Sequence, residues 1–188
     1  MNFDTGRFIL KIAETSEELH AAQRLRYKVF VEEMGANVAD DCHASRMEYD
    51  KFDQDFDHLI LIDSLNRNTA ENVVGVYRLM LNTSVNKNRG FYSSSEYNLD
   101  KLIKADRKIL ELGRSCIDKQ HRGGVALHMM WNGLAQYVID NNVEVLFGVA
   151  SFHGVDINLI NHALSYLHYN HLAPVELRPI AIGENKID

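Results

Sequence analysis

The spacing of apolar residues changes along the chain, and each spacing predicts a different element. Apolar and polar residues alternate in "GRFILKIAE", which predicts a first strand. Thr15 followed by Glu18 has the spacing of a capping box, and the periodicity of "EELHAAQRLRYKVFVEEMG" predicts a helix that ends at Gly35. The branched apolar runs "DHLILIDS" and "VVGVYRLML" flank a polar stretch and predict two strands joined by a turn.

The second half of the chain continues to mix strands with helices. Residues 82–108 are polar, with one short helix expected, and lead into a strand at "ILELGRSCID". After a glycine pair, apolar residues at helical spacing predict a helix from Val125 to about Asn141. "VEVLFGVAS" is typical of a buried strand and "DINLINHALSYLHYN" of a helix, while Pro179 makes "VELRPIAIG" a final edge strand. The pattern predicts one α/β domain over residues 1–188.

Composition narrows the function classes. The chain has 188 residues, 46% of them hydrophobic, which suffices for one core but not for two independent domains. Its net charge of -6 argues against a nucleic-acid binder, which needs a basic surface. Cys42 and Cys116 lack metal-ligand spacing, so no metal site is predicted and a reducing cytoplasm fits best. We expect no leader peptide and no membrane span, while peripheral contact with the inner membrane stays open.

Two loops carry residues that suit binding or catalysis. The first, "KQHRGGVA", lies between a strand and a helix N-terminus, where backbone N–H groups and the helix dipole would bind an anion such as phosphate. The alternative is a plain turn in which glycine supplies an unusual backbone angle. The second loop holds the carboxylates Glu48, Asp50, Asp53 and Asp57. They would either bind a cationic substrate or form a solvated acidic loop.

Charges inside apolar strands need an explanation, because burying an unpaired charge costs free energy. Glu111, Arg114 and Arg78 are such positions. Glu111 and Arg114 are three residues apart, so they should point to opposite faces of their strand. One interpretation is a catalytic site and another is a structural ion-pair network. Cys116 has no base beside it in the sequence, so a buried core cysteine is the simpler interpretation.

An ordered set of motifs carries a family resemblance. The set spans residues 24–174 and consists of "RLRYKVF", "EYDKFDQDFDHLIL", "VVGVYRL", "FYSSSEY", "ELGRSCIDKQHRGG", "LFGVASFHG" and "HALSYLHYNHLAP". It resembles the bacterial N-acyltransferases that make lyso-ornithine lipid, which belong to the GNAT acetyltransferase superfamily. It is more distantly similar to acyl-homoserine-lactone synthases. Their shared layout falls here on Arg26, Phe30, Glu48, Asp50, Asp53, Arg78, Glu111 and Arg114.

The resemblance implies both a fold and a reaction. The implied fold is one central mixed, mostly antiparallel sheet flanked by helices. It is splayed between the "ILELGRSCI" and "VEVLFGVAS" strands, so that a pantetheine arm can enter. The implied reaction moves a 3-hydroxy fatty acyl group from acyl carrier protein to the α-amine of L-ornithine, with no cofactor beyond the carrier's phosphopantetheine. The similar enzymes tend to continue past the position where this chain stops, so a C-terminal extension is expected to be lacking.

The resemblance also implies residue roles. Glu111 is the leading general base, and a backbone N–H near Arg114, Ser115 and Cys116 is the candidate oxyanion donor. The acceptor site comprises Arg26, Phe30, Glu48, Asp50, Asp53 and Arg78. The donor site comprises Lys119, Gln120, His121, Arg122, Gly123, Gly124, Ser151 and Phe152. Docking of an acidic carrier protein would use this turn together with Lys101, Lys104, Arg107 and Lys108.

One departure from the superfamily pattern bears on the donor. Whichever of Gly123 and Gly124 is aligned with the first glycine of the superfamily's phosphate loop, another position of that loop does not match. This incomplete match favours a carrier-protein donor over coenzyme A. Two other enzyme classes stay open, an acyl-homoserine-lactone synthase that uses S-adenosylmethionine and an N-acyl amino acid synthase with another amine. A non-catalytic sensor that binds acyl carrier protein or lipid is the alternative outside enzymes.

Overall fold

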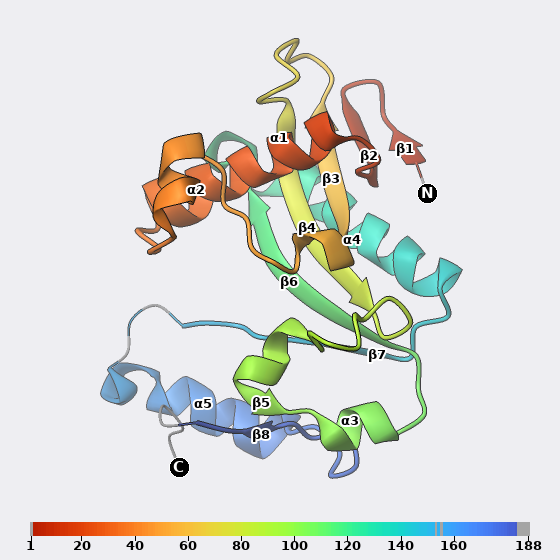
Figure 1. Ribbon diagram of the computed structural model, residues 1–188, viewed down its shortest axis with the longest axis vertical. Coiled ribbons are helices and arrows are strands. Elements are labelled where there is room, and N and C mark those ends of the chain that lie inside the picture. Colours follow the sequence, from red (N-terminus) through yellow and green to blue (C-terminus); the bar gives the residue numbers. More distant parts are fainter. Residues whose placement is uncertain (1, 153, 155, 184–188) are drawn as a thin grey trace.

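The computed structural model describes residues 2–152, 154 and 156–183, and its centre is a six-stranded sheet (Figure 1). The spatial order of the strands is β1-β2-β3-β4-β6-β7. All neighbouring pairs are antiparallel except β6 and β7, which are parallel. This arrangement confirms the predicted mixed, mostly antiparallel sheet. The strands are β1 (Asn2–Asp4), β2 (Phe8–Ile12), β3 (Asp57–Asp63), β4 (Val73–Leu81), β6 (Ile109–Ile117) and β7 (Val145–Gly148).

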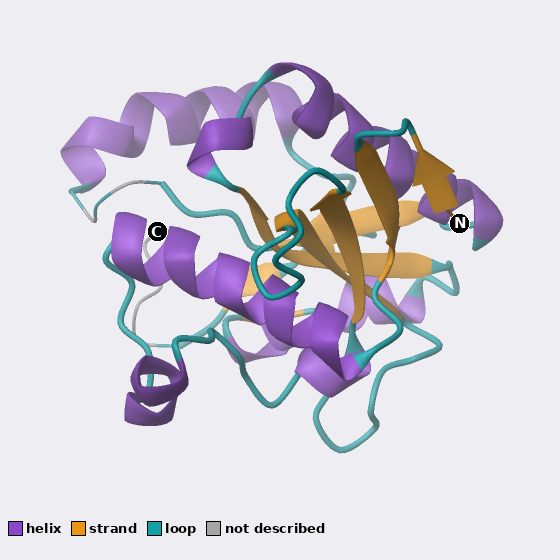
Figure 2. Ribbon diagram, turned by 90° about the horizontal axis from the view of Figure 1, so that it is seen from above, coloured by secondary structure: helices purple, strands orange, loops and turns teal. Residues whose placement is uncertain are grey.

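Helices cover both faces of the sheet, as Figure 2 shows from above. The α-helices are α1 (Ser16–Arg26), α2 (Asp40–Ser45), α3 (Asp100–Lys104), α4 (Gly124–Asp140) and α5 (Ile157–His171). The chain continues from α1 into a π-helical segment, η1 (Tyr27–Glu33). Short 3-10 helices are η2 (Asp53–Asp55), η3 (Tyr92–Ser95) and η4 (Lys119–His121). A separate small sheet pairs β5 (Tyr97–Asn98) with β8 (Ile180–Ala181).

The predicted helix ends are confirmed where the sequence carries a clear signal. The backbone N–H of Glu18 donates to the Thr15 hydroxyl at 3.2 Å, and the Glu18 carboxylate accepts from the Thr15 N–H at 3.3 Å. This reciprocal pair is a capping box. The helical run ends before Gly35, which takes a φ of 73° that L side chains rarely adopt. The helix expected from Val125 begins at Gly124 and ends at Asp140.

Clusters of apolar side chains hold the helices against the two faces of the sheet. On one face α1 packs Ala22 and Leu25 against Val76 of β4. On the other face α4 packs Met130 and Leu134 against the same sheet. A third cluster lies below, where η3 and α3 cover the lower ends of β4 and β6. The charged site described below is therefore held by a sheet whose two faces are both covered.

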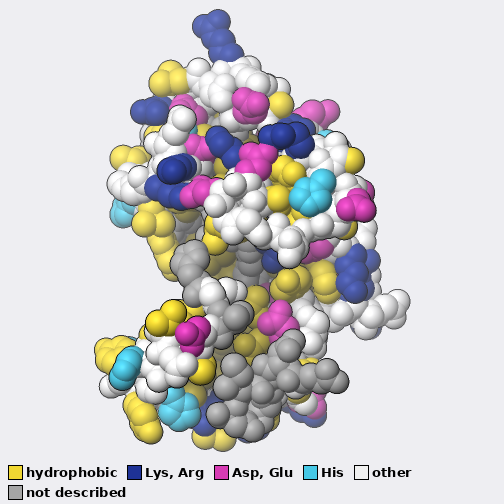
Figure 3. Space-filling view, turned by 90° about the vertical axis from the view of Figure 1, so that its left-hand side faces the viewer, with side chains coloured by type: hydrophobic (Ala, Val, Ile, Leu, Met, Phe, Trp, Pro, Cys, Tyr) yellow, Lys and Arg dark blue, Asp and Glu magenta, His cyan; other side chains and the backbone are white. Residues whose placement is uncertain are grey.

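The predicted splay is present between β6 and β7. The two strands pair only from Ile109 to Leu112 on β6 and from Val145 to Gly148 on β7, whereas β6 itself continues to Ile117. Beyond Gly148 the two strands separate, and backbone groups of β6 become available to a ligand. Figure 3 shows a hollowed face between the part of the molecule with α1 and α2 and the part with α5.

The C-terminal prediction was wrong in extent. "VELRPIAIG" was expected to form an edge strand, but only Ile180 and Ala181 are paired, and they pair with β5 and not with the main sheet. The preceding segment instead turns, with the Leu177 N–H donating to the Pro174 carbonyl at 3.0 Å. A turn closed in this way cannot extend the ladder. Among the described residues, no helix is long and apolar enough to cross a bilayer.

Candidate active site

Two arginines and one aspartate form the buried centre of the site. Arg26, at the end of α1, donates to Asp53 Oδ1 at 2.8 Å, and Arg78, in the middle of β4, donates to the same oxygen at 2.7 Å. Both arginines have 0% exposure. Burial alone would raise the pKa of Asp53, but the two guanidiniums outweigh burial and lower it to about 2. Asp53 is therefore ionised at neutral pH.

A second set of charges surrounds this centre. Glu48 accepts from Arg26 Nε at 2.5 Å and from Arg114 Nε at 2.9 Å. Asp50 accepts from Arg78 Nη1 at 2.8 Å, and among the described residues its other oxygen has only a long 3.5 Å contact with Arg114 Nη2. The three arginines and three carboxylates balance in charge. The structure thus brings the predicted charged residues together as one network.

The network opens on one side into a cavity of about 1120 Å³. Glu48, Asp50 and Arg114 line the cavity, while Arg26, Arg78 and Asp53 lie behind them. Further lining residues come from the chain after α1, from the two splayed strands and from η3. They include Phe30, Met34, Val38, Tyr77, Tyr92, residues 112–115 and residues 149–151. The cavity therefore combines an apolar wall, a charged wall and the splayed strand ends.

A β-bulge in β6 determines how Arg114 reaches the network. The register with β4 shifts so that Tyr77 alone lies opposite Arg114 and Ser115, and Arg114 takes a φ of 52°. The extra residue breaks the alternation of side chains. Glu111 and Arg114 consequently both contact Tyr92. The prediction that they point to opposite faces was wrong, because it assumed a regular strand.

Glu111 is placed differently from the predicted general base. Its side chain is buried, and it accepts hydrogen bonds from the Tyr92 N–H at 2.8 Å, the Ser93 N–H at 2.7 Å and the Ser93 hydroxyl. Both carboxylate oxygens are thus used to hold η3 against β6. Within the described chain, Glu111 is not among the residues that line the cavity. This geometry favours a positioning role over direct proton transfer.

Tyr92 is a site residue that sequence reasoning missed. Its hydroxyl accepts from Arg114 Nη1 at 3.4 Å, and its ring lies 5.0 Å from the Arg114 guanidinium and 5.6 Å from that of Arg78. The ring also meets Phe52 edge to face. Tyr92 belongs to "FYSSSEY", one of the motifs that carry the family resemblance, but no role was assigned to it. The structure shows that Tyr92 joins Glu111 to the charged network.

The remaining catalytic candidates separate into an exposed and a buried residue. Ser115 is exposed and lines the cavity at the bulge. Cys116 packs against α1, and burial raises the pKa of its thiol to about 12. A protonated, buried thiol is not a nucleophile, which supports the interpretation as a core cysteine. Its backbone remains part of the candidate oxyanion segment.

The predicted donor residues do not gather in one place. Gly123 and Gly124 have φ values of 85° and 57° at the start of α4, and Arg122 is paired with Glu33 at 2.5 and 2.6 Å. Ser151 lines the main cavity, and Phe152 is partly exposed nearby in sequence. Lys119 is exposed beside the turn. The glycine turn and residues 151–152 are therefore separate candidate contacts for a long donor.

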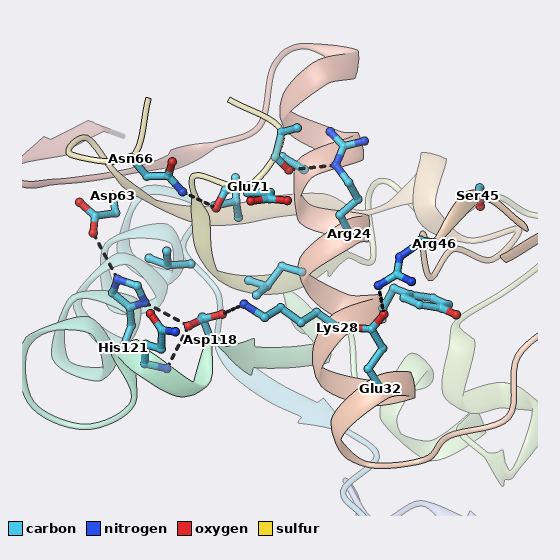
Figure 4. Close-up of a pocket in the computed structure, with 17 residues that line it drawn as sticks. Arg24, Lys28, Glu32, Ser45, Arg46, Asp63, Asn66, Glu71, Asp118 and His121 are labelled. Atoms are coloured by element: carbon cyan, nitrogen blue, oxygen red, sulfur yellow. Dashed lines mark hydrogen bonds and ion pairs between the residues drawn. The ribbon is translucent and has the colours of Figure 1, made fainter. Parts of the chain in front are cut away.

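Gln120 and His121 instead line a second hollow of about 600 Å³ next to α1. Figure 4 shows Asp118 between Lys28 and His121, with Asp63 on the other side of the imidazole. His121 Nδ1 lies 3.3 Å from Asp118 and its Nε2 lies 3.2 Å from Asp63. Both nitrogens of the imidazole ring therefore contact carboxylates of the protein itself. The structure does not place it in the main cavity.

The basic residues expected to form one docking surface lie beyond opposite ends of β6. Lys101 and Lys104 belong to α3, which precedes β6, whereas Lys119 follows β6. β6 has 9 residues, which at roughly 3.3 Å per residue separates the groups by about 30 Å. This separation makes docking of the carrier protein on one of the two groups more favourable than docking on both at once. In the part of the chain that the structure describes, no cluster of His, Cys, Asp and Glu has the form of a metal site.

Comparison with known proteins gives the family. The model of the acetyltransferase (GNAT) domain matches residues 25–132. An L-ornithine Nα-acyltransferase of Rhodobacter capsulatus is 44% identical over 180 residues, which cover 95% of this chain and 70% of that protein. The chain belongs to the L-ornithine Nα-acyltransferase family. A second member of this family, from Agrobacterium fabrum, is 34% identical over 95% of this chain and 62% of its own length.

Solved structures support the GNAT fold of this L-ornithine Nα-acyltransferase family member. The AHL synthase LasI matches with a TM-score of 0.54 and 17% identity, over 94% of this chain and 89% of that chain. FeeM, an N-acyl amino acid synthase from uncultured soil microbes, matches with a TM-score of 0.55 and 14% identity, over 94% and 88%. At these identities the likeness concerns the fold. The chain spans 55% of the family member from Rhizobium meliloti, so the curated relatives are longer.

Proposed function

We propose that this chain transfers a fatty acyl group, typically a 3-hydroxyacyl group, from acyl carrier protein to the α-amine of L-ornithine. The product would be lyso-ornithine lipid. The observation that carries the proposal is the cavity at the splay, which is lined by apolar side chains and by a charged wall containing Glu48, Asp50 and Arg114. An acyl chain suits the apolar lining and an amino acid suits the charged wall. The names of the relatives support the choice of ornithine.

The reaction requires a neutral amine, a proton acceptor and a donor for the oxyanion. The amine nitrogen attacks the thioester carbon, the C–S bond then breaks, and the carrier's sulfur leaves as a thiolate that takes a proton. Asp50 is the proposed proton acceptor, because within the described part of the chain its Oδ2 has only the 3.5 Å contact with Arg114, and its side chain is 23% exposed. Asp53 does not suit this task, because two buried arginines hold its carboxylate.

The bulge offers the proposed oxyanion contact. A backbone N–H at Arg114 or Ser115 would donate to the thioester oxygen as negative charge develops there, and such a donor is worth roughly 3 kcal/mol of barrier. The Arg114 guanidinium would bind the carboxylate of the acceptor as a fork. Glu111 would act through η3, by holding Tyr92 against Arg114. These roles assign the charged network to the acceptor and the splay to the thioester.

The donor part of the proposal rests on the splay. The pantetheine arm would lie between β6 and residues 149–151, pairing with backbone groups like an added strand. No cofactor beyond the carrier's phosphopantetheine is proposed. Because the product carries a fatty acyl chain, contact with the membrane surface is included in the proposal.

The deciding experiment supplies the protein with 3-hydroxyacyl carrier protein and a panel of amines, and identifies the product by mass spectrometry. Acylated ornithine is expected. Acyl-homoserine lactone formed from S-adenosylmethionine, or an acylated derivative of a different amino acid only, would replace the proposal with the corresponding synthase. Absence of any acylated amine, together with measurable binding of the carrier protein, would indicate a non-catalytic sensor.

A further inference from the structure

The main cavity is also lined by charged side chains that do not belong to the six-residue network. The network contains three arginines and three carboxylates. Among the described residues, the other charged side chains that line the cavity are Asp41, Lys51 and Glu96. They leave an excess of one negative charge. An acceptor that brings one additional positive charge would therefore match the cavity better than a neutral amino acid.

Hydrogen bonds hold the backbone of Glu96 in place. Its N–H donates to the Ser93 carbonyl at 3.1 Å, and its own carbonyl accepts from the Ile182 N–H at 2.9 Å. Tyr97, the next residue, pairs with Ala181 in the small sheet. On the other side, η3 is held by the buried Glu111 carboxylate. The position of Glu96 on the cavity wall is therefore set before a ligand arrives.

The Glu96 carboxylate is also the charge that is available to a ligand. In residues 2–152, 154 and 156–183, it has no hydrogen-bond or ion-pair partner. Asp41, in contrast, accepts from the Cys42 N–H at 2.9 Å. The ammonium of Lys51 lies 5.3 Å from the centre of the Phe52 ring. A cationic group entering the cavity would thus meet Glu96 as an unpaired carboxylate.

We propose that Glu96 is a specificity residue that pairs with a side-chain ammonium group of the acceptor. This inference rests on the proposed function, and it extends that function to the choice between diamino acids and neutral amino acids. Arg114 would hold the acceptor's carboxylate at one end and Glu96 its side-chain ammonium at the other. The α-amine would then lie between them, near Asp50. The two ion pairs fix which amine of a diamino acid faces the thioester.

The test compares Glu96→Gln with the unchanged protein on two acceptors, L-ornithine and L-norvaline. Norvaline has the same carbon chain but no side-chain amine. For ornithine, we expect kcat/KM to fall about 10- to 100-fold through KM, because one charge-assisted hydrogen bond is lost. For norvaline, kcat/KM should stay within about twofold. Glu176→Gln removes one charge from an exposed turn outside the cavity and should change neither acceptor.

Three results would count against the proposal in distinguishable ways. If the unchanged protein acylates neither acceptor, the proposed function is wrong and the inference falls with it. If it acylates ornithine and Glu96→Gln leaves the preference over norvaline intact, only the inference is wrong. If Glu96→Gln lowers kcat/KM equally for both acceptors, Glu96 supports the fold of the wall and does not select the side chain.

Discussion

Asp53 shows how strongly a single carboxylate can depend on its neighbours. It joins two arginines with 0% exposure, and they hold its pKa at about 2, below the ordinary value of 3.8. A lowered folded-state pKa means that Asp53 stabilises the fold fully above about pH 4 and loses this contribution as the pH falls through 2. The shift corresponds to roughly 2 kcal/mol. Part of the acid sensitivity of the fold should therefore come from this residue.

Asp53→Asn should cost more than that shift, about 3 to 5 kcal/mol at neutral pH, because Arg26 and Arg78 would be left buried without their shared partner. Chemical denaturation from pH 7 to pH 2 measures it, and the gap to the unchanged protein should narrow below about pH 4. Asp100→Asn is the matched control, since its pair with Lys104 is exposed and worth little. A gap that stays constant down to pH 2 would contradict the assigned role.

Single and double variants distinguish the role of Asp50, the proposed proton acceptor, from that of Glu111, which is proposed to position Tyr92. Asp50→Asn should lower kcat about 100-fold or more, because it removes the proposed proton acceptor. Glu111→Gln and Ser93→Ala should each cost less, and the double variant should lose less than the product of the two, because both loosen the same turn. Steady-state kinetics of the single and double variants measures this coupling. If Glu111→Gln matches Asp50→Asn and combines independently with Ser93→Ala, Glu111 is the base.

The elements differ in how far their sequence determines them. The helix that begins after Thr15 was predictable because its capping box and the stop at Gly35 are local signals. The bulge in β6 was not predictable, because a strand pattern gives no local sign of one extra residue opposite Tyr77. That one residue decides whether Arg114 reaches Glu48. The elements were thus foreseen more reliably than the irregularity on which the site depends.

Gly148 marks where the two splayed strands part. A Cβ at this position would collide with the backbone carbonyl oxygen of Leu112, and a backbone atom cannot move away cheaply. Gly148→Ala should therefore push β7 away from β6, with a loss of about 1 to 3 kcal/mol in unfolding free energy. Gly113→Ala is the matched control on the neighbouring strand, because the nearest described atoms to its Cβ would be those of the Arg78 guanidinium, at 4.0 Å. Thermal and chemical denaturation compare the two, and equal stability would refute the close approach.

The molecule as a whole brings together residues that no local pattern connects. Family resemblance placed Arg26, Asp53 and Arg78 in one acceptor site, and the fold joins them through α1, η2 and β4. It did not show that Glu111 would bind Tyr92 and Ser93, because that contact depends on how η3 folds back on the sheet. The glycine turn and the α3 lysines looked alike as basic segments. Their separation by the length of β6 is a property of the tertiary structure alone.

That separation leads to a prediction about carrier-protein docking. The pantetheine arm is proposed to enter at the splay, beyond the last paired residues of β6, and Lys119 follows that end of the strand whereas Lys101 precedes the other end. An acidic carrier protein would therefore meet the exposed Lys119 and not Lys101. Lys119→Glu should raise the KM for acyl carrier protein several-fold, more at low salt than at high salt.

Lys101→Glu is the matched control, because it makes the same charge reversal on an exposed lysine. Its KM for acyl carrier protein should stay within about twofold of the unchanged protein at every salt concentration. Initial rates at 50 and 500 mM salt, with ornithine saturating, isolate the donor step. If Lys101→Glu raises this KM and Lys119→Glu does not, the carrier docks at the α3 end, and the pantetheine path along the splay would have to run in the opposite direction.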